Sequence, residues 1–185
     1  MSGRGLHLAL TDQELSNLRK QSAEHQADYI GEALEAAKFD TDDACETDKS
    51  WAYIHSALNG TDPDGPLAMG AEPKQGFLSG IFGRTQQYQI SDGRYAIMGD
   101  SAVLDSEDYY IGLIAKDRVP TVWTALAAIS TDEMGRLVKE VHRKFAASGS
   151  ATDAADYAMS WFPALVQFYS SAADARKHVI FTVDF

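Results

Sequence analysis

The stretch from residue 48 to residue 60 places the strongest constraint on how this chain can fold. Its sequence, Asp-Lys-Ser-Trp-Ala-Tyr-Ile-His-Ser-Ala-Leu-Asn-Gly, repeats its largest side chains at the i, i+3, i+4, i+7 spacing of one helical face. These side chains belong to Trp51, Ile54, His55 and Leu58. Thr47 or Asp48 can accept backbone N–H bonds at the first turn, and Gly60 can supply a left-handed end. The pattern predicts a short amphipathic helix with a tryptophan and a histidine on its apolar face.

Strands are predicted at both ends of the chain and near its middle. Residues 5–10 alternate, with every second residue a leucine, which predicts a strand with one buried face. Residues 178–184 alternate in the same way, with valine and phenylalanine on one face. Residues 109–115 are rich in aromatic and β-branched side chains, which are typical of a strand. The two terminal strands could be neighbours at the middle of a sheet.

Capping residues and a proline mark the helices. Residues 11–14, Thr-Asp-Gln-Glu, match a capping box and open a helical stretch to about Lys38. The polar middle of that stretch leaves open whether it is one helix or two. Residues 130–133, Ser-Thr-Asp-Glu, match a second capping box. Because proline fits poorly inside a helix, Pro163 places the start of the last helix near Phe162.

The remaining segments predict connections between these elements. Residues 39–49 are an acidic connector, and residues 100–108 are an acidic turn. Residues 60–93 contain many prolines and glycines and predict a long, irregular, insertion-like loop. The length of 185 residues suits a single domain spanning 1–185. The order of elements predicts an α+β fold, with several helices packed on a small mixed or antiparallel sheet of N-terminal, central and C-terminal strands.

Four segments of the chain form an ordered set. They are Gly3-Arg-Gly-Leu-His-Leu-Ala-Leu-Thr11, Asp48-Lys-Ser-Trp-Ala-Tyr-Ile-His55, the run from Ala96-Ile-Met-Gly99 to Tyr109-Tyr-Ile, and Trp161-Phe-Pro-Ala-Leu-Val-Gln-Phe-Tyr169 with Val179-Ile-Phe-Thr-Val183. In content and order they resemble the YfbM-like family of bacterial domains of unknown function. The second segment is similar to that family's Asp-Lys-Ala-Trp-x-x-Ile-His helix, whereas residues 60–93 look longer than its usual connector. The resemblance implies a single α+β domain and brings no established activity.

The charge of the chain narrows the classes of partner. With 27 acidic and 16 basic residues, the net charge is -11, which argues against nucleic acid and against an anionic membrane surface. The sequence has neither the apolar core of a signal peptide nor a run of about 18 apolar residues, so we expect a cytoplasmic protein. Cys45 is the single cysteine and lies in an acidic run, which predicts a poor nucleophile.

Histidines supply one candidate site. His55 and His7 could converge with Asp105 or Asp108 in an acid–base or zinc-like set. The favoured interpretation is that His55 is a partly buried histidine, hydrogen-bonded to the backbone beside the tryptophan of its helix. Residues 62–65, Asp-Pro-Asp-Gly, begin like a calcium loop but lack its later ligands and predict a plain turn. No nucleotide-binding or metal motif is present, so we expect neither a cofactor nor a metal.

A second candidate site lies between residues 100 and 110, where carboxylates and phenols follow one another. Its members are Asp100, Asp105, Glu107, Asp108, Tyr109 and Tyr110. Such a cluster could perform acid–base chemistry, or it could receive a basic partner with the tyrosines as anchors. The favoured interpretation is a solvated turn before a strand. With Trp51 and His55, these residues form the candidate binding set.

Three functional hypotheses follow. The first is a non-catalytic acidic binding protein, such as an immunity protein that neutralises a basic toxin. The second is an uncharacterised hydrolase or transferase with a His/Asp site near His55. The third is a homodimeric structural or regulatory protein, and the sequence leaves open whether the chain is a monomer or a homodimer.

Overall fold

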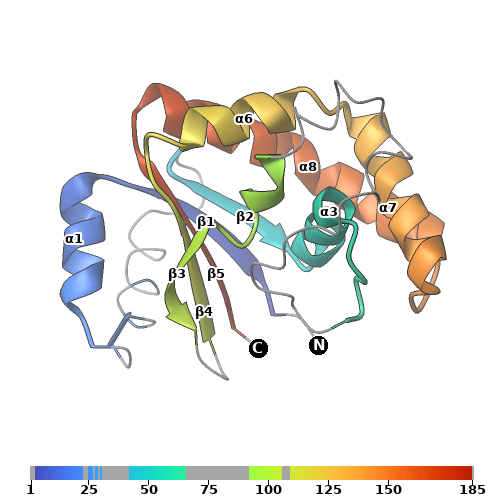
Figure 1. Ribbon diagram of the computed structural model, residues 1–185, viewed down its shortest axis with the longest axis horizontal. Coiled ribbons are helices and arrows are strands. Elements are labelled where there is room, and N and C mark those ends of the chain that lie inside the picture. The colour runs from blue at the N-terminus through green and yellow to red at the C-terminus, as the bar shows by residue number, and fades with distance from the viewer. Residues whose placement is uncertain are drawn as a thin grey trace.

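An antiparallel sheet forms the centre of the computed structural model (Figure 1). Its described strands are β1 (Gly5–Leu10), β2 (Ala44–Asp48), β3 (Ser101–Asp105), β4 (Tyr109–Ile114) and β5 (His178–Asp184). Their order is β2-β1-β5-β4-β3, so the two terminal strands are neighbours and β5 occupies the middle. The predicted α+β class is confirmed, and the sheet is antiparallel. The residues that the structure describes are 3–22, 25, 26, 28, 30, 42–65, 92–105 and 109–184.

Helices cover both faces of this sheet. Those described are α1 (Asp12–Lys20), α3 (Ser50–Asn59), α6 (Val119–Ala127), α7 (Thr131–Phe145) and α8 (Ala151–Asp174), with a 3₁₀ turn η1 (Gly93–Tyr95). Helices α3, α6, α7 and α8 lie on one face, and α1 lies on the other (Figure 1). This arrangement produces two hydrophobic cores separated by the sheet.

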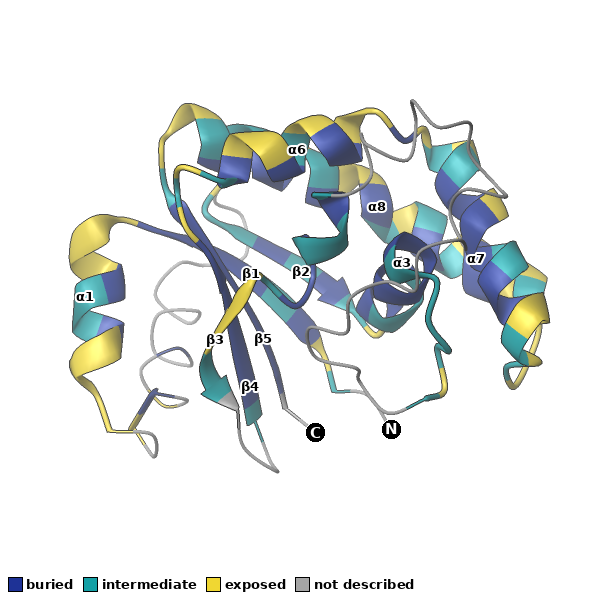
Figure 2. Cartoon of the chain, viewed as in Figure 1, coloured by how far each residue is buried: buried dark blue, intermediate teal, exposed yellow. Residues whose placement is uncertain are grey.

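Both faces of β1 are buried, which corrects the prediction of one buried face. Leu8 and Leu10 pack in the core on the α1 side, while Ala9 packs in the larger core under the other helices. His7 is also fully buried on that larger-core side. Figure 2 shows the inner strands in dark blue along most of their length. A strand covered by helices on both faces can bury residues on both sides, so alternation in its sequence does not mark a solvent face.

The two helix starts predicted from capping residues are confirmed. Thr11 and Glu14 form the expected capping box at the start of α1, with reciprocal backbone and side-chain bonds. The helix ends at Lys20, because Gln21 is extended. The long stretch therefore begins as a separate helix, and most of the segment to Lys38 lies outside the described residues. Ser130 caps α7 through the Glu133 N–H.

Two acidic connectors contain strands that the sequence did not predict. Within residues 39–49, Ala44–Asp48 form β2, in which Cys45 and Thr47 are buried and the other three residues are partly exposed. Within residues 100–108, Ser101–Asp105 form β3. In the described part of the chain, each of these strands pairs on one edge only. An edge strand tolerates charged and small residues that make its sequence resemble a turn.

Helix α8 is continuous across Pro163, which corrects the prediction of a new helix near Phe162. Proline removes one backbone hydrogen bond, to the carbonyl of Met159. Pro163 is exposed. Because the proline lies on the solvent side, water can satisfy the freed carbonyl, and the apolar face of α8 remains in register.

Helix α3 forms as the sequence predicts, but it is buried on nearly all sides. Trp51 is 1% exposed and its Nε1 donates to the Gly3 carbonyl at 2.9 Å. Gly60 ends the helix with the expected left-handed backbone, at φ 67°. The predicted side-chain cap is absent at the N-terminus, where Lys49 occupies the cap position. The Thr47 hydroxyl donates to the Gly5 carbonyl, and the Asp48 carboxylate accepts from the Tyr157 hydroxyl. Most of the predicted loop at 60–93 lies outside the described residues.

Candidate functional site

The structure places His55 in a buried, neutral environment. His55 is 7% exposed, and burial lowers its pKa to about 4. Its Nδ1 lies 3.3 Å from the Asn59 side-chain nitrogen, which also donates to the Arg94 carbonyl at 3.2 Å. Asn59 therefore joins α3 to the turn at η1, and the uncharged His55 ring lies beside this link.

His7 occupies a separate environment on β1. Its ring packs among the rings of Phe168, Tyr169 and Phe181, and its Nε2 lies 3.2 Å from the Ala96 carbonyl. Burial lowers its pKa to about 4 as well. The two histidines thus contact different residues, and the structure does not bring them together with the described carboxylates. Asp108 and the side chain of Asp105 lie outside the described residues.

The cluster predicted between residues 100 and 110 is divided by the fold. Asp100 pairs with Arg118 at 3.0 Å, and the same guanidinium pairs with Asp92. Tyr110 is 3% exposed and its hydroxyl donates to the Met98 carbonyl at 2.7 Å, so it does not offer the expected surface anchor. Tyr109 is half-buried against the core on the α1 side. Glu107 lies outside the described residues, as does Asp108.

The other polar motifs hold loops in place. In the turn at 61–65, Asp62 accepts the Asp64 N–H at 3.0 Å, and Asp64 accepts both the N–H and the hydroxyl of Ser148. This is the plain turn that the sequence predicted, tied to the connection between α7 and α8. Within the described segments, no three His, Cys, Asp or Glu side chains lie close enough to hold a metal ion.

Three polar side chains join the start of α1, the end of β4 and the start of β5. His178 Nε2 lies 2.9 Å from Asp12, and its Nδ1 accepts the Lys116 backbone N–H at 3.1 Å. Because Nδ1 accepts, Nε2 carries the proton and donates to the carboxylate. The Lys116 ammonium binds the same carboxylate, and this bond is the main cause of the lowered pKa of Asp12. The cluster is fully engaged in linking these elements.

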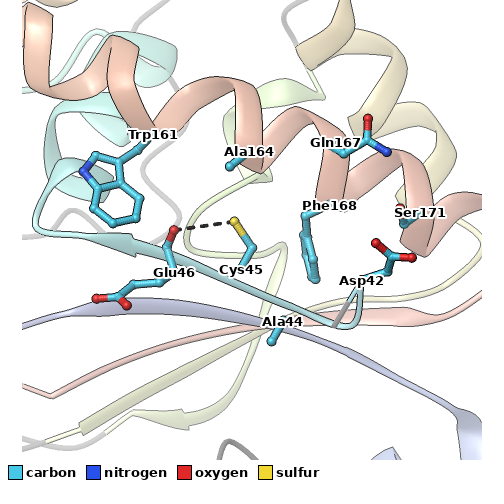
Figure 3. A pocket seen from close by; sticks show the side chains of 9 residues that line it. All are labelled: Asp42, Ala44, Cys45, Glu46, Trp161, Ala164, Gln167, Phe168 and Ser171. Carbon is cyan, nitrogen blue, oxygen red and sulfur yellow. Dashed lines mark hydrogen bonds between the residues drawn. The ribbon is translucent and has the colours of Figure 1, made fainter. Parts of the chain in front are cut away.

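An open groove lies between β2 and α8 (Figure 3). Its volume is about 370 Å³. The residues that line it are Asp42, Ala44, Cys45, Glu46, Trp161, Ala164, Gln167, Phe168 and Ser171. Trp161 lies at one end, and Asp42 lies beside Ser171 at the other (Figure 3). The groove therefore combines an aromatic end, an apolar floor and a carboxylate.

The cysteine in this groove is chemically inert. Cys45 is buried, and burial together with the neighbouring Glu46 raises the pKa of its thiol to about 12. The thiol donates weakly to the Glu46 carbonyl at 3.5 Å. The Glu46 carboxylate turns away from α8 (Figure 3) and binds Arg4 at 2.7 Å. The predicted poor nucleophile agrees with this environment, and the groove is suited to binding.

Sequence reasoning did not identify the groove. The sequence predicts a connector where β2 forms, and it predicts that the last helix begins near Phe162, after Trp161. One signal was available: Trp161, Ala164, Phe168 and Ser171 follow helical spacing, yet this face mixes aromatic, small and polar residues. Such a mixed face is typical of a partly exposed surface.

Comparisons with known proteins support the fold and leave the activity open. A structure described as a protein of unknown function, YfbM from Escherichia coli, superposes with a TM-score of 0.65 and 15% identity over 100% of both chains. No curated protein matches. None of the helices in the described segments has the length and apolar character needed to cross a membrane. The family model for a domain of unknown function, DUF1877, matches residues 1–182, and the chain belongs to this family.

Proposed function

We propose that this protein is a non-catalytic binding protein whose partner is a basic protein, in the manner of an immunity protein that neutralises a toxin. We place it in the bacterial cytoplasm. The groove between β2 and α8 is the observation that carries the proposal. It offers an aromatic side chain, Trp161, for burial and a carboxylate, Asp42, for a cation, which are the two elements of a specific interface.

The charge of the whole chain supports this choice of partner. A net charge of -11 attracts a positively charged protein and accelerates its association at low salt. The groups most suited to catalysis are engaged elsewhere or neutral. His7 and His55 are buried with lowered pKa values, and the Cys45 thiol has a raised one. These features favour recognition over chemistry.

Co-purification tests the proposal. The full chain, tagged and expressed in its native host, should retain one basic protein in a stoichiometric complex, identified by mass spectrometry. Asp42→Lys should weaken that complex, because it reverses the charge at the end of the groove. Asp156→Lys is the matched control, since Asp156 is exposed on α8 outside the groove and carries the same charge change.

Two results would contradict the proposal. One is a chain that elutes alone from its host at low salt. The other is a complex that the two charge reversals weaken equally, which would indicate non-specific attraction to an acidic surface.

A further inference from the structure

We propose that the groove binds an extended basic segment of the partner, which adds as an additional strand to the edge of β2 that has no neighbour among the described strands. This inference rests on the binding function proposed above and specifies how the partner is held. It follows from three observations: the direction of the β2 main chain, the helix beside the edge, and the charges around it.

The main chain of β2 points hydrogen-bonding groups into the groove. The Ala9 N–H donates to the Asp43 carbonyl at 2.9 Å, which fixes the alternation of the ladder between β1 and β2. In an antiparallel pair, every second residue turns its N–H and C=O toward the neighbouring strand. The main-chain N–H and C=O of Cys45 therefore point toward β1, and those of Ala44 and Glu46 point away from it. Both of these residues line the groove, and the Glu46 carbonyl accepts from the Cys45 thiol there (Figure 3).

The edge is available in the part of the chain that the structure describes. There, β2 pairs with β1 alone and stands last in the order of the sheet. The main-chain groups of Ala44 and Glu46 would each gain a partner from a strand placed about 4.8 Å away. The five residues of β2 set the length of such a strand at about five residues.

Helix α8 supplies the wall against which the added segment would rest. Trp161, Ala164 and Phe168 face the groove from successive turns of the helix. An edge strand beside a helix is the arrangement in which peptides bind by strand addition: main-chain bonds give affinity, and alternate side chains enter pockets. One side chain of the segment would lie over Phe168, between Trp161 and the far end of the groove.

The charges select a basic segment and disfavour a second copy of this chain. Pairing β2 with β2 of another copy would bring the exposed Asp42 and the partly exposed Asp48 near acidic residues of that copy, and like charges across a strand pair are destabilising. The Glu46 carboxylate adds little to this repulsion, because it is already paired with Arg4. Lysine or arginine in the segment would instead meet Asp42 at the exposed end. Acidic side chains at this edge thus discourage self-association while they favour a basic strand.

A selected peptide tests this mode directly. A phage-displayed library of random dodecapeptides is selected for binding to the full chain. The most enriched peptide is synthesised, and its affinity is measured by calorimetry. We expect lysine or arginine at alternate positions beside apolar residues. An extended peptide has two sets of alternate residues, one facing β2 and one facing away from it. Methylation of the backbone nitrogens in the set that faces β2 should weaken binding by roughly tenfold or more, and methylation of the other set should have little effect.

A variant of β2 tests the same bonds from the protein side. Ala44→Pro removes an N–H that faces the groove and leaves the ladder with β1 intact, because proline is tolerated at an outward-facing position of an edge strand. Peptide affinity should fall roughly tenfold. Ala44→Val is the control, since it keeps the N–H. Hydrogen exchange of the unmodified chain adds a measurement without substitution: the amides of Ala44 and Glu46 should slow on binding.

The outcomes separate the mode from the function. Strand addition is overturned by a peptide that tolerates methylation of either set of alternate residues. It is also overturned if the amides of Ala44 and Glu46 exchange no more slowly when the peptide is bound. If that peptide still loses affinity with Ala164→Arg but not with Ala127→Arg, an exposed helical alanine of α6, the groove remains a binding site and only the mode fails. Failure to select any groove-dependent peptide overturns the inference outright, whereas the co-purification with Asp42→Lys decides the binding function independently.

Discussion

Replacing Gly5 with alanine should destabilise the protein, because no space exists for a methyl group where β1 passes under α3. A Cβ at Gly5 would lie 2.5 Å from Trp51 Cδ1 and 2.9 Å from Phe181 Cε2. Real Cβ atoms essentially never approach other atoms this closely. Both rings are fully buried and in contact with each other, so neither can withdraw into solvent.

The magnitude follows from two opposing effects. Overpacking a rigid core costs about 1–3 kcal/mol. Alanine also restricts the unfolded chain, which stabilises the native state by about 0.4–1 kcal/mol. Gly93→Ala shares the second effect with little of the first, since its Cβ would lie 3.4 Å from the nearest atom, Ala125 Cβ. We expect Gly5→Ala to lower the free energy of unfolding by about 2 kcal/mol relative to Gly93→Ala.

Urea unfolding followed by circular dichroism measures this difference. A double-mutant cycle with Trp51→Leu then assigns the cause, because the smaller side chain opens room beside Gly5. The coupling energy between the two sites should lie at about 1 kcal/mol or more. Equal free energies of unfolding for Gly5→Ala and Gly93→Ala would refute the reasoning, and so would purely additive effects in the cycle.

Three further predictions concern titratable groups. The Lys116 and His178 side chains hold the pKa of Asp12 below its usual range, so this stabilisation exists above the unfolded value of about 4 and is lost as the pH falls through the lower native value. Urea midpoints for Asp12→Asn should therefore fall less steeply in acid than those of the unmodified chain. Burial lowers the pKa of His7 and His55 to about 4, so the unfolded chain takes up protons first, and stability should fall between pH about 6.5 and about 4. In nuclear magnetic resonance, their ring signals should stay constant from pH about 7 to about 5.5. The Cys45 thiol, with its pKa raised to about 12, should react with a disulfide reagent only after urea unfolds the chain.

The elements that could be predicted are those in which buried residues recur at regular spacing along the sequence. The strands at residues 5–10 and 178–184, the helix around Trp51 and the cap at Thr11 all follow from spacing. The failures have a shared physical cause, which is that edge and surface positions are set by tertiary contacts. Among the described strands β2 pairs on one side only, and its acidic residues Glu46 and Asp48 are partly exposed, so its sequence resembles a connector.

The candidate site was harder to predict than the fold. His55 and Tyr110 belong to the predicted binding set because their side chains are polar or aromatic, yet both are buried and serve the core. The groove depends on bringing Asp42 and Trp161 together across more than a hundred residues, which local patterns do not reveal. Side-chain type indicates possible chemistry, whereas exposure and partners decide whether it is available.

The central place of β5 has a consequence for how this protein is made. Strands β1 and β4 flank β5 and meet only through it. During synthesis, the edges of β1 and β4 that pair with β5 remain unpaired until residues 178–184 leave the ribosome. The sheet thus cannot be completed progressively as the chain emerges. A ribosome that stops before residue 178 releases a chain in which β1 and β4 each have an edge without the β5 partner. Such a product is a natural substrate for chaperones and proteases.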